Sequence, residues 1–302
     1  IHAGPFANIA HGNSSIIADR LALSIHDIVV TEAGFGADLG AEKALHIKTN
    51  ASGLAPDCIV VNVTVRSMKM HGLGMVGLPN GKDALDEENE EMVRHGASAN
   101  LSRHIENMSR FGPDVIVSIN RFPTDSEAEI SAIMEIAKDA GAADVALYEG
   151  HAKGGEGAIE LANSVSKAVQ RHMAAGRPFN PLFEGNAPVI EKIENIATSI
   201  YGASGISVKP RAKKQLDKIN EWGYGNLPVC MAKTQYSFSH DPAQYGAPNN
   251  FTLPVREFRL NAGAGFIVAV CGDMMTMPGL PKIPAAEGMD MDKDGNLTGI
   301  FS

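Results

Sequence analysis

The sequence predicts an α/β protein with largely parallel sheets and flanking helices. Short apolar runs of strand length alternate along the chain with longer segments of helical periodicity. Runs such as "CIVVNVTV" and "DVIVSIN" are typical of strands buried inside a sheet that helices cover. Glycine-rich loops follow several of these runs. In this fold class ligands bind beyond the carboxyl ends of the strands, so those loops are where functional residues are expected.

The amino-terminal third begins in a loop rich in glycine, histidine and asparagine, and then alternates between helix and strand. Apolar residues at helical spacing predict the first helix, and short apolar runs predict the strands. In order, we expect a helix at 14–24, a strand at 27–30, a glycine loop, a helix at 39–47, a strand at 58–65 and a long glycine-rich loop at 66–83.

The middle third continues the alternation. The acidic run "DEENEE" is expected at the solvated start of a helix that reaches Met108, because carboxylates complement the dipole there. Strands are expected at 114–120 and 144–148. Between them, Thr124 and Glu127 have the spacing of a capping box, which opens a helix ending at Gly141.

The second half of the chain contains three further helices and three strand-like stretches. Pro188 near the start and Gly202 beyond the end fit the preferences of helix termini. We expect helices at 154–173, 188–202 and 211–223, and strands at 227–232, 251–260 and 265–272.

Composition narrows the class of protein. The formal charge of −9 over 302 residues, without a cluster of cations, argues against nucleic-acid binding. The apolar runs are too short for a membrane span. Cys58, Cys230 and Cys271 are odd in number, far apart and placed in or beside apolar runs, as expected of reduced thiols in the cytoplasm.

Three familiar motifs are incomplete. Asp290, Asp292, Asp294 and Gly295 match a calcium loop, but Phe301 stands where a bidentate glutamate is needed, so we expect a solvated turn and no metal site. The glycines of "GFGADLG" do not have dinucleotide-binding spacing. "GKD" at 81–83 is not a phosphate loop, because no serine or threonine follows the lysine.

Seven longer stretches together are more specific than composition. They are "GPFANIAHG", "VTEAGFGADLGAEK", "VRSMKMHG", "FPTDSEAE", "AKGGEG", "YGNLPVCMAKTQYSFS" and "TMPGLPKIPA". In this order they resemble formate–tetrahydrofolate ligase, and "DGNLTGIF" resembles that family's terminal segment. The resemblance runs from Ile1 to Phe301. In the family a substantial portion carrying the phosphate loop precedes "GPFANIAHG", so the chain resembles the carboxy-terminal half.

The resemblance implies a P-loop NTPase-like large domain, partial here, and a second α/β domain. The implied division is 1–110 for the rest of the nucleotide and formate domain and 111–260 for a domain with a folate-side pocket. Residues 261–282 would return a strand to the first domain, and 283–302 would form a small terminal segment.

The family's reaction converts ATP, formate and tetrahydrofolate into ADP, phosphate and 10-formyltetrahydrofolate by way of formyl phosphate. The resemblance therefore implies ATP with Mg²⁺ as co-substrate, the missing amino-terminal half as partner, and a homotetramer. A dependence on a monovalent cation is typical of the family, so the resemblance implies one here as well. Without a phosphate loop, the chain alone is expected to be inactive. The alternative is a non-catalytic binding or assembly module that keeps the fold. Both interpretations rest on the same residues of this chain.

On the folate side, Phe122 follows a predicted strand and matches the family's aromatic that stacks on the planar ligand. His151 stands where the family commonly has tryptophan before "AKGG", and Tyr148 is the aromatic that could replace it. Gly279, Leu280 and Pro281, in a loop stiffened by prolines, are expected to form one wall of the site. The structural alternative for Phe122 is an apolar plug before the next helix, and for the loop at Gly279 it is a simple chain reversal.

On the formyl phosphate or anion side, Gly34 and Gly36 offer backbone N–H groups, with Asp38 nearby. Lys69 and His71 match a family signature just past a strand. A structural turn is the competing interpretation of the first set, and packing or contact with another domain is that of the second. Lys233, Thr234 and Gln235 follow an apolar strand, and could meet either ligand or the other domain.

Overall fold

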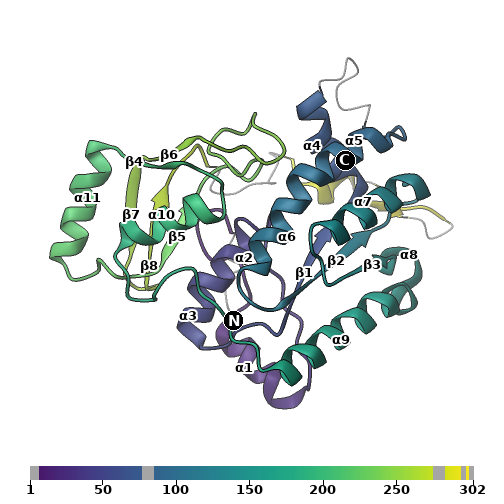
Figure 1. The fold of residues 1–302 in the computed structure, drawn as a ribbon, viewed down its shortest axis with the longest axis horizontal. Helices are drawn as coiled ribbons and strands as arrows, with labels where there is room; N and C mark the ends of the chain where they lie inside the picture. Colours follow the sequence, from purple (N-terminus) through teal and green to yellow (C-terminus); the bar gives the residue numbers. More distant parts are fainter. Residues whose placement is uncertain (1–6, 77–84, 275–282, 294–296, 299–302) are drawn as a thin grey trace.

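A computed structural model describes residues 7–76, 85–274, 283–293 and 297–298. It has two α/β units side by side, each with sheet strands and flanking helices (Figure 1). The predicted fold class, with parallel sheets and flanking helices, is confirmed. No helix in the described ranges is long and apolar enough to cross a membrane.

The first unit contains a three-stranded parallel sheet of order β1-β2-β3. Its strands are β1 Cys58–Val63, β2 Asp114–Asn120 and β3 Asp144–Tyr148. The central residues of β2 are all buried, so helices cover both of its faces. Helices α6 Ser102–Ser109, α7 Glu127–Asp139 and α9 Ile159–Ala175 contact these strands.

Residues 66–76, predicted as loop, instead form most of helix α4 Val65–Val76. Its two glycines mark close approach of other parts of the chain rather than a loop. A Cβ on Gly72 would lie 2.0 Å from the Met92 carbonyl oxygen in α5 Glu90–Gly96, and one on Gly74 would lie 2.1 Å from the ring of Tyr245, which lies outside any helix. The other residues of α4 include arginine, methionine, lysine and leucine, which favour a helix. The loop prediction was wrong because a glycine in a helix can serve close approach.

The helix expected to begin at a Thr124–Glu127 capping box begins two residues later. The Ser126 hydroxyl accepts from the Glu129 N–H, and the Glu129 carboxylate accepts from the Ser126 N–H. Both pairs have the same spacing, so the pattern alone could not choose. The predicted stop is confirmed, since α7 ends beside Gly141, whose φ is 93°.

The second unit contains two small sheets. One has the order β5-β8-β7 and the other pairs β4 with β6. The stretch predicted as one strand at 251–260 is divided at Arg256 into β6 and β7, which belong to different sheets. The elements are α10 Val189–Ser199, β4 Gly205–Val208, α11 Pro210–Glu221, β5 Val229–Ala232, β6 Thr252–Val255, β7 Glu257–Asn261 and β8 Phe266–Val270.

The amino-terminal segment lies at the lower margin of the molecule (Figure 1). Helix α1 Ile16–Ile25 is confirmed, but the strand expected at 27–30 is absent. These residues are not assigned to a strand, because they have no ladder partner among the described residues. Helix α2 Gly40–Lys43, the π-helical turn Ala44–Lys48 and α3 Thr49–Ser52 form the next expected helix.

The four predicted domain ranges stay a prediction. The boundary at residue 110 falls between β1 and β2, which pair from Cys58–Asp114 to Val63–Ile119. Strand β8, within 261–282, pairs with β5 and β7.

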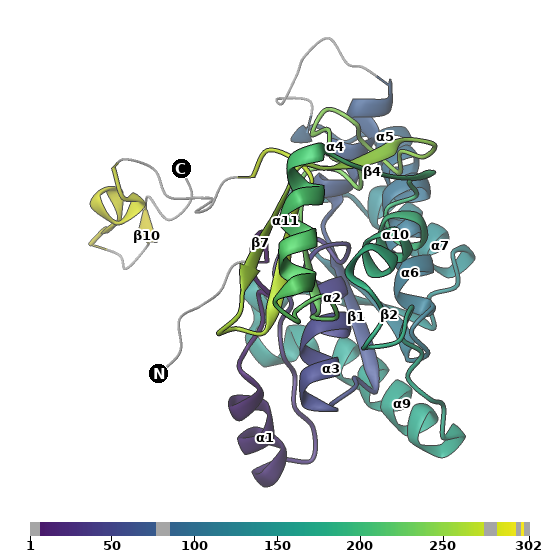
Figure 2. The same ribbon diagram turned by 90° about the vertical axis from the view of Figure 1, so that its left-hand side faces the viewer.

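The carboxy-terminal residues form a short hairpin of β9 Asp290–Met291 and β10 Leu297–Thr298, set apart from the body in Figure 2. Part of the incomplete calcium loop lies here, while Asp294 and Gly295 lie outside the described residues. Within the described ranges no group of three histidine, cysteine or acidic side chains could hold a metal.

Candidate functional site

The predicted folate-side residues Phe122, Tyr148 and His151 lie at one edge of the first sheet. Phe122 follows β2 and is 49% exposed, and Tyr148 is the last residue of β3. The Arg121 N–H donates to the Tyr148 carbonyl oxygen at 3.0 Å, which joins the two strand ends. His151 is exposed in α8 Gly150–Lys153. Parallel strands therefore bring the three predicted residues to the carboxyl edge where this fold class binds ligands.

Two backbone features hold this edge in shape. The Phe122 N–H donates to Asp125 Oδ2 at 2.8 Å, which closes the turn after β2. A Cβ on Gly150 would lie 2.2 Å from the Tyr148 hydroxyl, so the tyrosine side chain lies directly against a residue that must be small. The Phe122 ring is thus presented on a fixed turn with half of its surface open to a ligand.

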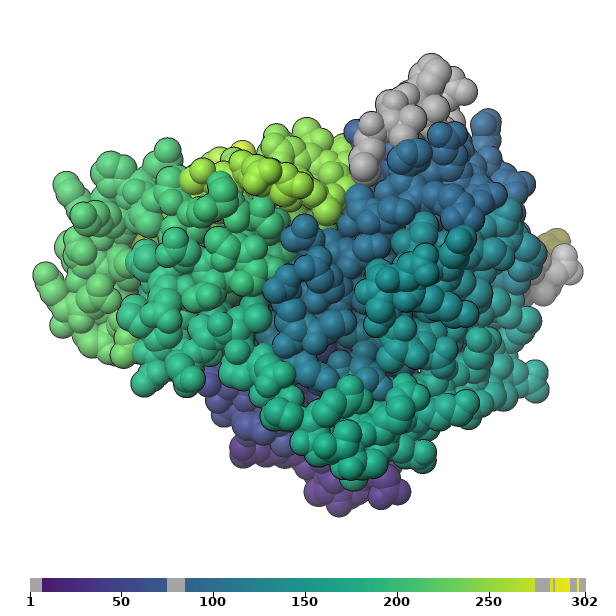
Figure 3. Space-filling view, viewed as in Figure 1, coloured from purple at the N-terminus to yellow at the C-terminus, as the bar shows by residue number. Residues whose placement is uncertain are grey.

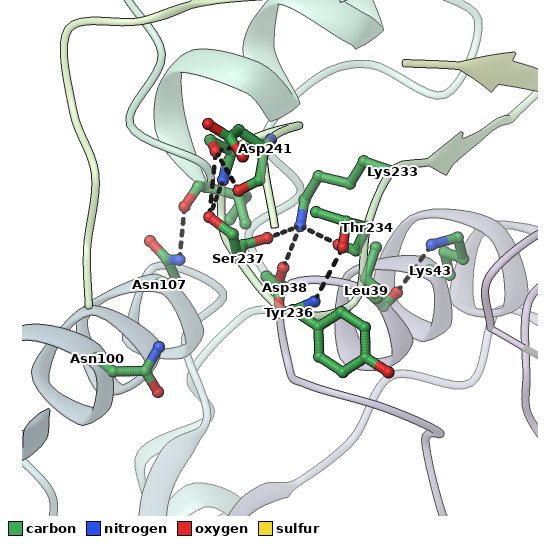
Figure 4. A network of polar contacts seen from close by, with 12 residues as sticks. Asp38, Leu39, Lys43, Asn100, Asn107, Lys233, Thr234, Tyr236, Ser237 and Asp241 are labelled. Carbon is green, nitrogen blue, oxygen red and sulfur yellow. Dashed lines mark hydrogen bonds and ion pairs between the residues drawn. The ribbon is translucent and has the colours of Figure 1, made fainter. Parts of the chain in front are cut away.

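The predicted anion-side residue Asp38 is buried and paired with Lys233. The Lys233 ammonium lies 2.6 Å from Asp38 Oδ2 and donates to the Ser237 carbonyl oxygen at 2.5 Å and the Thr234 carbonyl oxygen at 3.2 Å. It also lies 4.8 Å from the centre of the Tyr201 ring. This network joins the "FGADLG" and "MAKTQYSFS" loops, which are about two hundred residues apart in sequence (Figure 4).

The pKa values of Asp38 and Lys233 are set by burial and by the charge of the partner. Burial by itself raises the pKa of the Asp38 carboxyl, but Lys233, His104 and Lys43 outweigh it and hold that pKa below its ordinary value. Burial lowers the pKa of the Lys233 ammonium, and Asp38 opposes the shift. A lysine and a carboxylate this deeply enclosed fix two loops against each other.

His71 belongs to the same neighbourhood. It accepts a hydrogen bond at Nδ1 from the Gly246 N–H at 3.2 Å, and its ring meets Tyr245 edge-on at 6.2 Å. Burial, reinforced by the charge of His104, lowers the pKa of His71 to about 4. The imidazole is therefore neutral at pH 7 with its proton on Nε2, so it can donate one hydrogen bond from that atom.

Lys69 is not brought to this cluster. Its ammonium lies 2.7 Å from Glu129 Oε1 and donates to the Glu87 carbonyl oxygen at 2.7 Å, and the side chain is 3% exposed. Because the Glu129 carboxylate neutralises the Lys69 ammonium, this lysine adds little positive charge to the cluster around Asp38. The pair links α4 to α7 within the first unit, which fits the packing alternative that the sequence left open, and it lies beside Asp125 of the Phe122 turn.

The glycines of "FGADLG" serve a tight turn. A Cβ on Gly40 would lie 1.8 Å from the Gly34 carbonyl oxygen, and one on Gly36 would lie 2.6 Å from Asp38 Oδ1. Phe35, between Gly34 and Gly36, has φ of 62°, an uncommon conformation for a bulky residue. The Gly34 N–H donates to the Gly12 carbonyl oxygen at 3.2 Å, so the loop "AHG" lies beside it.

Sequence reasoning missed two residues of the cluster. His104 was expected only as part of the helix that reaches Met108, yet its Nδ1 is buried and has no hydrogen-bond partner among the described residues, and burial lowers the pKa of the ring. Tyr201 was expected near a helix end, but it is 1% exposed. A polar residue on an apolar helical face is the signal that could have found His104. Gly279, Leu280 and Pro281 lie outside the described residues.

Comparison with known proteins covers the whole chain. A family model described as formate–tetrahydrofolate ligase matches residues 1–301. The formate–tetrahydrofolate ligase of Symbiobacterium thermophilum is 50% identical over 302 residues, which are 100% of this chain and 52% of that protein. The ligase of Granulibacter bethesdensis is 48% identical over 301 residues, or 51% of its length. The chain thus spans about half the length of the curated relatives it matches.

Proposed function

The chain belongs to the formate–tetrahydrofolate ligase family, and we propose that it supplies the tetrahydrofolate side of a ligase that joins formate to tetrahydrofolate at the expense of ATP. The single observation that carries the proposal is the half-exposed Phe122 at the carboxyl edge of the first sheet, with Tyr148 at the end of the neighbouring strand and His151 in the helix that follows it. An aromatic face on a rigid turn suits a planar pterin or aminobenzoyl ring.

The anion side of the proposed reaction lies around the cluster of Asp38, Lys233 and His71, which we call the second cluster. Asp38 and Lys233 hold the "FGADLG" turn in place. The Gly34 N–H already donates to the Gly12 carbonyl oxygen, so the backbone N–H groups around Gly36 are the candidates to approach an anion. His71 is the candidate to donate one neutral hydrogen bond from Nε2. Lys69, whose charge Glu129 compensates, positions α4 rather than binding the anion.

The proposed chemistry has two steps. A formate oxygen attacks the γ-phosphorus of ATP, which gives formyl phosphate and releases ADP. The folate amine then attacks the formyl carbon, the carbon–oxygen bond to phosphate breaks, and the amine loses its proton. Phosphoryl transfer of this kind rests on positioning and on neutralised charge. The ATP phosphates and Mg²⁺ would be held by the portion of the ligase that this chain does not match, in a cytoplasmic tetramer as is typical of the family.

Tetrahydrofolate binding to the 302-residue chain tests the proposal without requiring turnover. Phe122→Ala should weaken binding about tenfold, since it removes buried aromatic area and the stacking contribution of roughly 0.5–1.5 kcal/mol. Trp222→Ala is the matched control, because this aromatic is 62% exposed on the other unit, beyond α11. Equal affinities for the chain and for Phe122→Ala, with circular dichroism unchanged, would remove the proposed folate side.

A further inference from the structure

A cavity of about 380 Å³ lies between the region around α3 and the loop that follows α9. Residues between 45 and 55 line one side of it, and residues between 179 and 185 line the other. In Figure 3 the purple-to-blue residues around α3 adjoin the green residues that follow α9 at the lower margin of the molecule. A cavity of about 150 Å³ is enough for benzene, so this one has room for two fused rings.

The cavity lies at the opposite edge of the first sheet from the candidate folate side. Gly53 and Ala55 line it and come just before β1. Phe111 comes just before β2, and its ring stacks on Phe179 of the cavity wall with 5.9 Å between ring centres. Because β1 and β2 are parallel, the segments that precede them meet at the amino edge of the sheet. Phe122 follows β2 at the carboxyl edge, so the two sites are separate.

The loop that forms the second wall is held in place by hydrogen bonds. The Asn180 N–H donates to the Phe111 carbonyl oxygen at 2.9 Å. The Gly185 carbonyl oxygen accepts from the buried Lys192 ammonium at 2.7 Å. The wall is therefore formed before any ligand binds, as is usual for small-molecule sites.

Aromatic rings gather at this cavity. The ring of His46, in the π-helical turn, stacks on Phe183 with 4.5 Å between centres and an interplanar angle of 28°. Its centre also lies 5.3 Å from that of Phe111. Phe179 and Phe183 line the cavity and are only partly buried, so ring surface remains open there. Rings of this kind favour a flat aromatic ligand, which packs offset or edge-on against them.

The Glu42 carboxylate orients the His46 ring. Glu42 Oε1 lies 2.8 Å from His46 Nδ1, and the two side chains are 0% and 2% exposed. A carboxylate accepts hydrogen bonds, so we assign the imidazole proton to Nδ1, which leaves a lone pair on Nε2 of the neutral ring. His46 lines the cavity, yet its Nε2 is buried and has no hydrogen-bond partner among the described residues. A buried acceptor without a donor is unfavourable, and a ligand N–H would supply the donor.

We propose that this cavity binds an uncharged, planar heteroaromatic molecule that carries a ring N–H. The molecule packs against the rings of Phe179 and Phe183 and donates its N–H to His46 Nε2. The Glu42 carboxylate behind His46 disfavours an anion in the cavity. The site does not depend on the proposed function, because it lies at the other edge of the sheet.

Indole and benzofuran test the proposal on the 302-residue chain. Benzofuran has the same two fused rings, but an oxygen replaces the N–H. Calorimetry should show one indole bound per chain, and benzofuran should bind about tenfold more weakly because it leaves the buried acceptor unpaired. In long-range ¹⁵N–¹H NMR spectra, indole should shift the His46 Nε2 resonance. The absence of indole binding, or equal affinity for the two compounds, would overturn the proposal.

Gly185→Leu locates the site without touching His46. A Cβ on Gly185 would lie 2.5 Å from Asn50 Oδ1, and its three nearest atoms all belong to the exposed Asn50 side chain, which can move aside. The leucine should therefore fold normally, occupy part of the cavity and weaken indole binding at least about tenfold. Gly263→Leu is the matched control, since a Cβ there meets no described atom within 4 Å, and it should bind indole normally. Unchanged binding by Gly185→Leu would overturn the assignment.

His46→Phe tests the hydrogen bond from the side of the protein. It keeps an aromatic ring against Phe183 but removes the acceptor, so indole and benzofuran should bind with equal affinity, and a remaining preference for indole would contradict the role of Nε2. If loss of the partner of Glu42 unfolds this variant in a urea titration, the benzofuran and Gly185→Leu results decide. Saturating tetrahydrofolate should leave indole binding unchanged. Competition between the two would move indole to the Phe122 edge and overturn the proposal.

Discussion

The ammonium of Lys233 should be a large contributor to the stability of the second cluster, and Lys233→Met removes it while keeping an apolar stem of similar length. The side chain is fully buried, and the ammonium contacts Asp38 at 2.6 Å, Ser237 at 2.5 Å and Thr234 at 3.2 Å. Removing it leaves a buried carboxylate without its counterion and two carbonyl oxygens without this donor.

The expected loss in the free energy of unfolding is about 3–5 kcal/mol, which is the range for breaking a buried pair on one side. Asp38→Asn should cost less, because an amide oxygen can still accept from the ammonium. The double variant should cost less than the sum of the two by at least ~1 kcal/mol, since the partners are in direct contact. Arg110→Met is the control: its partner Glu106 is 55% exposed, and an exposed pair contributes about 0–1 kcal/mol.

Urea unfolding followed by circular dichroism measures these differences. The pKa of Asp38 is lowered on folding, so its stabilising effect is present above the ordinary value of 3.8 and is lost as the pH falls through the folded pKa. The cost of Asp38→Asn should therefore be full at pH 7 and shrink below pH 3.8. A Lys233→Met variant as stable as Arg110→Met, or strict additivity in the double variant, would refute the buried-pair reasoning.

Three further predictions concern single residues. Gly40→Ala should destabilise the chain by about 1–3 kcal/mol because its methyl group would lie 1.8 Å from the Gly34 oxygen, whereas Gly205→Ala meets open space and should change stability by less than about 0.5 kcal/mol in the same urea assay. In NMR titrations the His71 ring should stay neutral at pH 6 and titrate near its pKa of about 4, and a midpoint near 6.5 would contradict its burial. Burial raises the pKa of the Cys271 thiol to about 12, so iodoacetamide at pH 8 should modify it only after unfolding, and rapid labelling of the native chain would contradict this.

The sequence was sufficient for elements whose signal is local. The runs at 114–120 and 144–148 became the strands β2 and β3, since a buried strand is recognisable from its own residues. The same rule failed at 27–30, because a strand also needs a partner, and the described residues provide none. At 66–76 the glycines suggested a loop, but Gly72 lies against helix α5 and Gly74 against the Tyr245 ring, and no local pattern contains such close contacts.

The candidate site was predictable to the extent that strand ends determine it. Phe122 and Tyr148 meet because their strands are neighbours in a parallel sheet, which the alternation of elements predicts. The pairing of Asp38 with Lys233 could not be predicted, because it joins loops of two different units and depends on how those units pack. The pairing of Lys69 with Glu129 could not be predicted either, because it depends on how α4 packs against α7.

Formate-dependent release of ADP tests the division of labour at the centre of this account. The 302-residue chain, supplied with Mg²⁺, ATP, formate and tetrahydrofolate, is predicted to release no ADP above the buffer rate, because none of its glycine loops has the spacing of a phosphate loop. Adding the unmatched portion of the Symbiobacterium thermophilum ligase should restore release that depends on both formate and tetrahydrofolate. Turnover by the chain alone would contradict the account, as would a complex of the two that stays inactive.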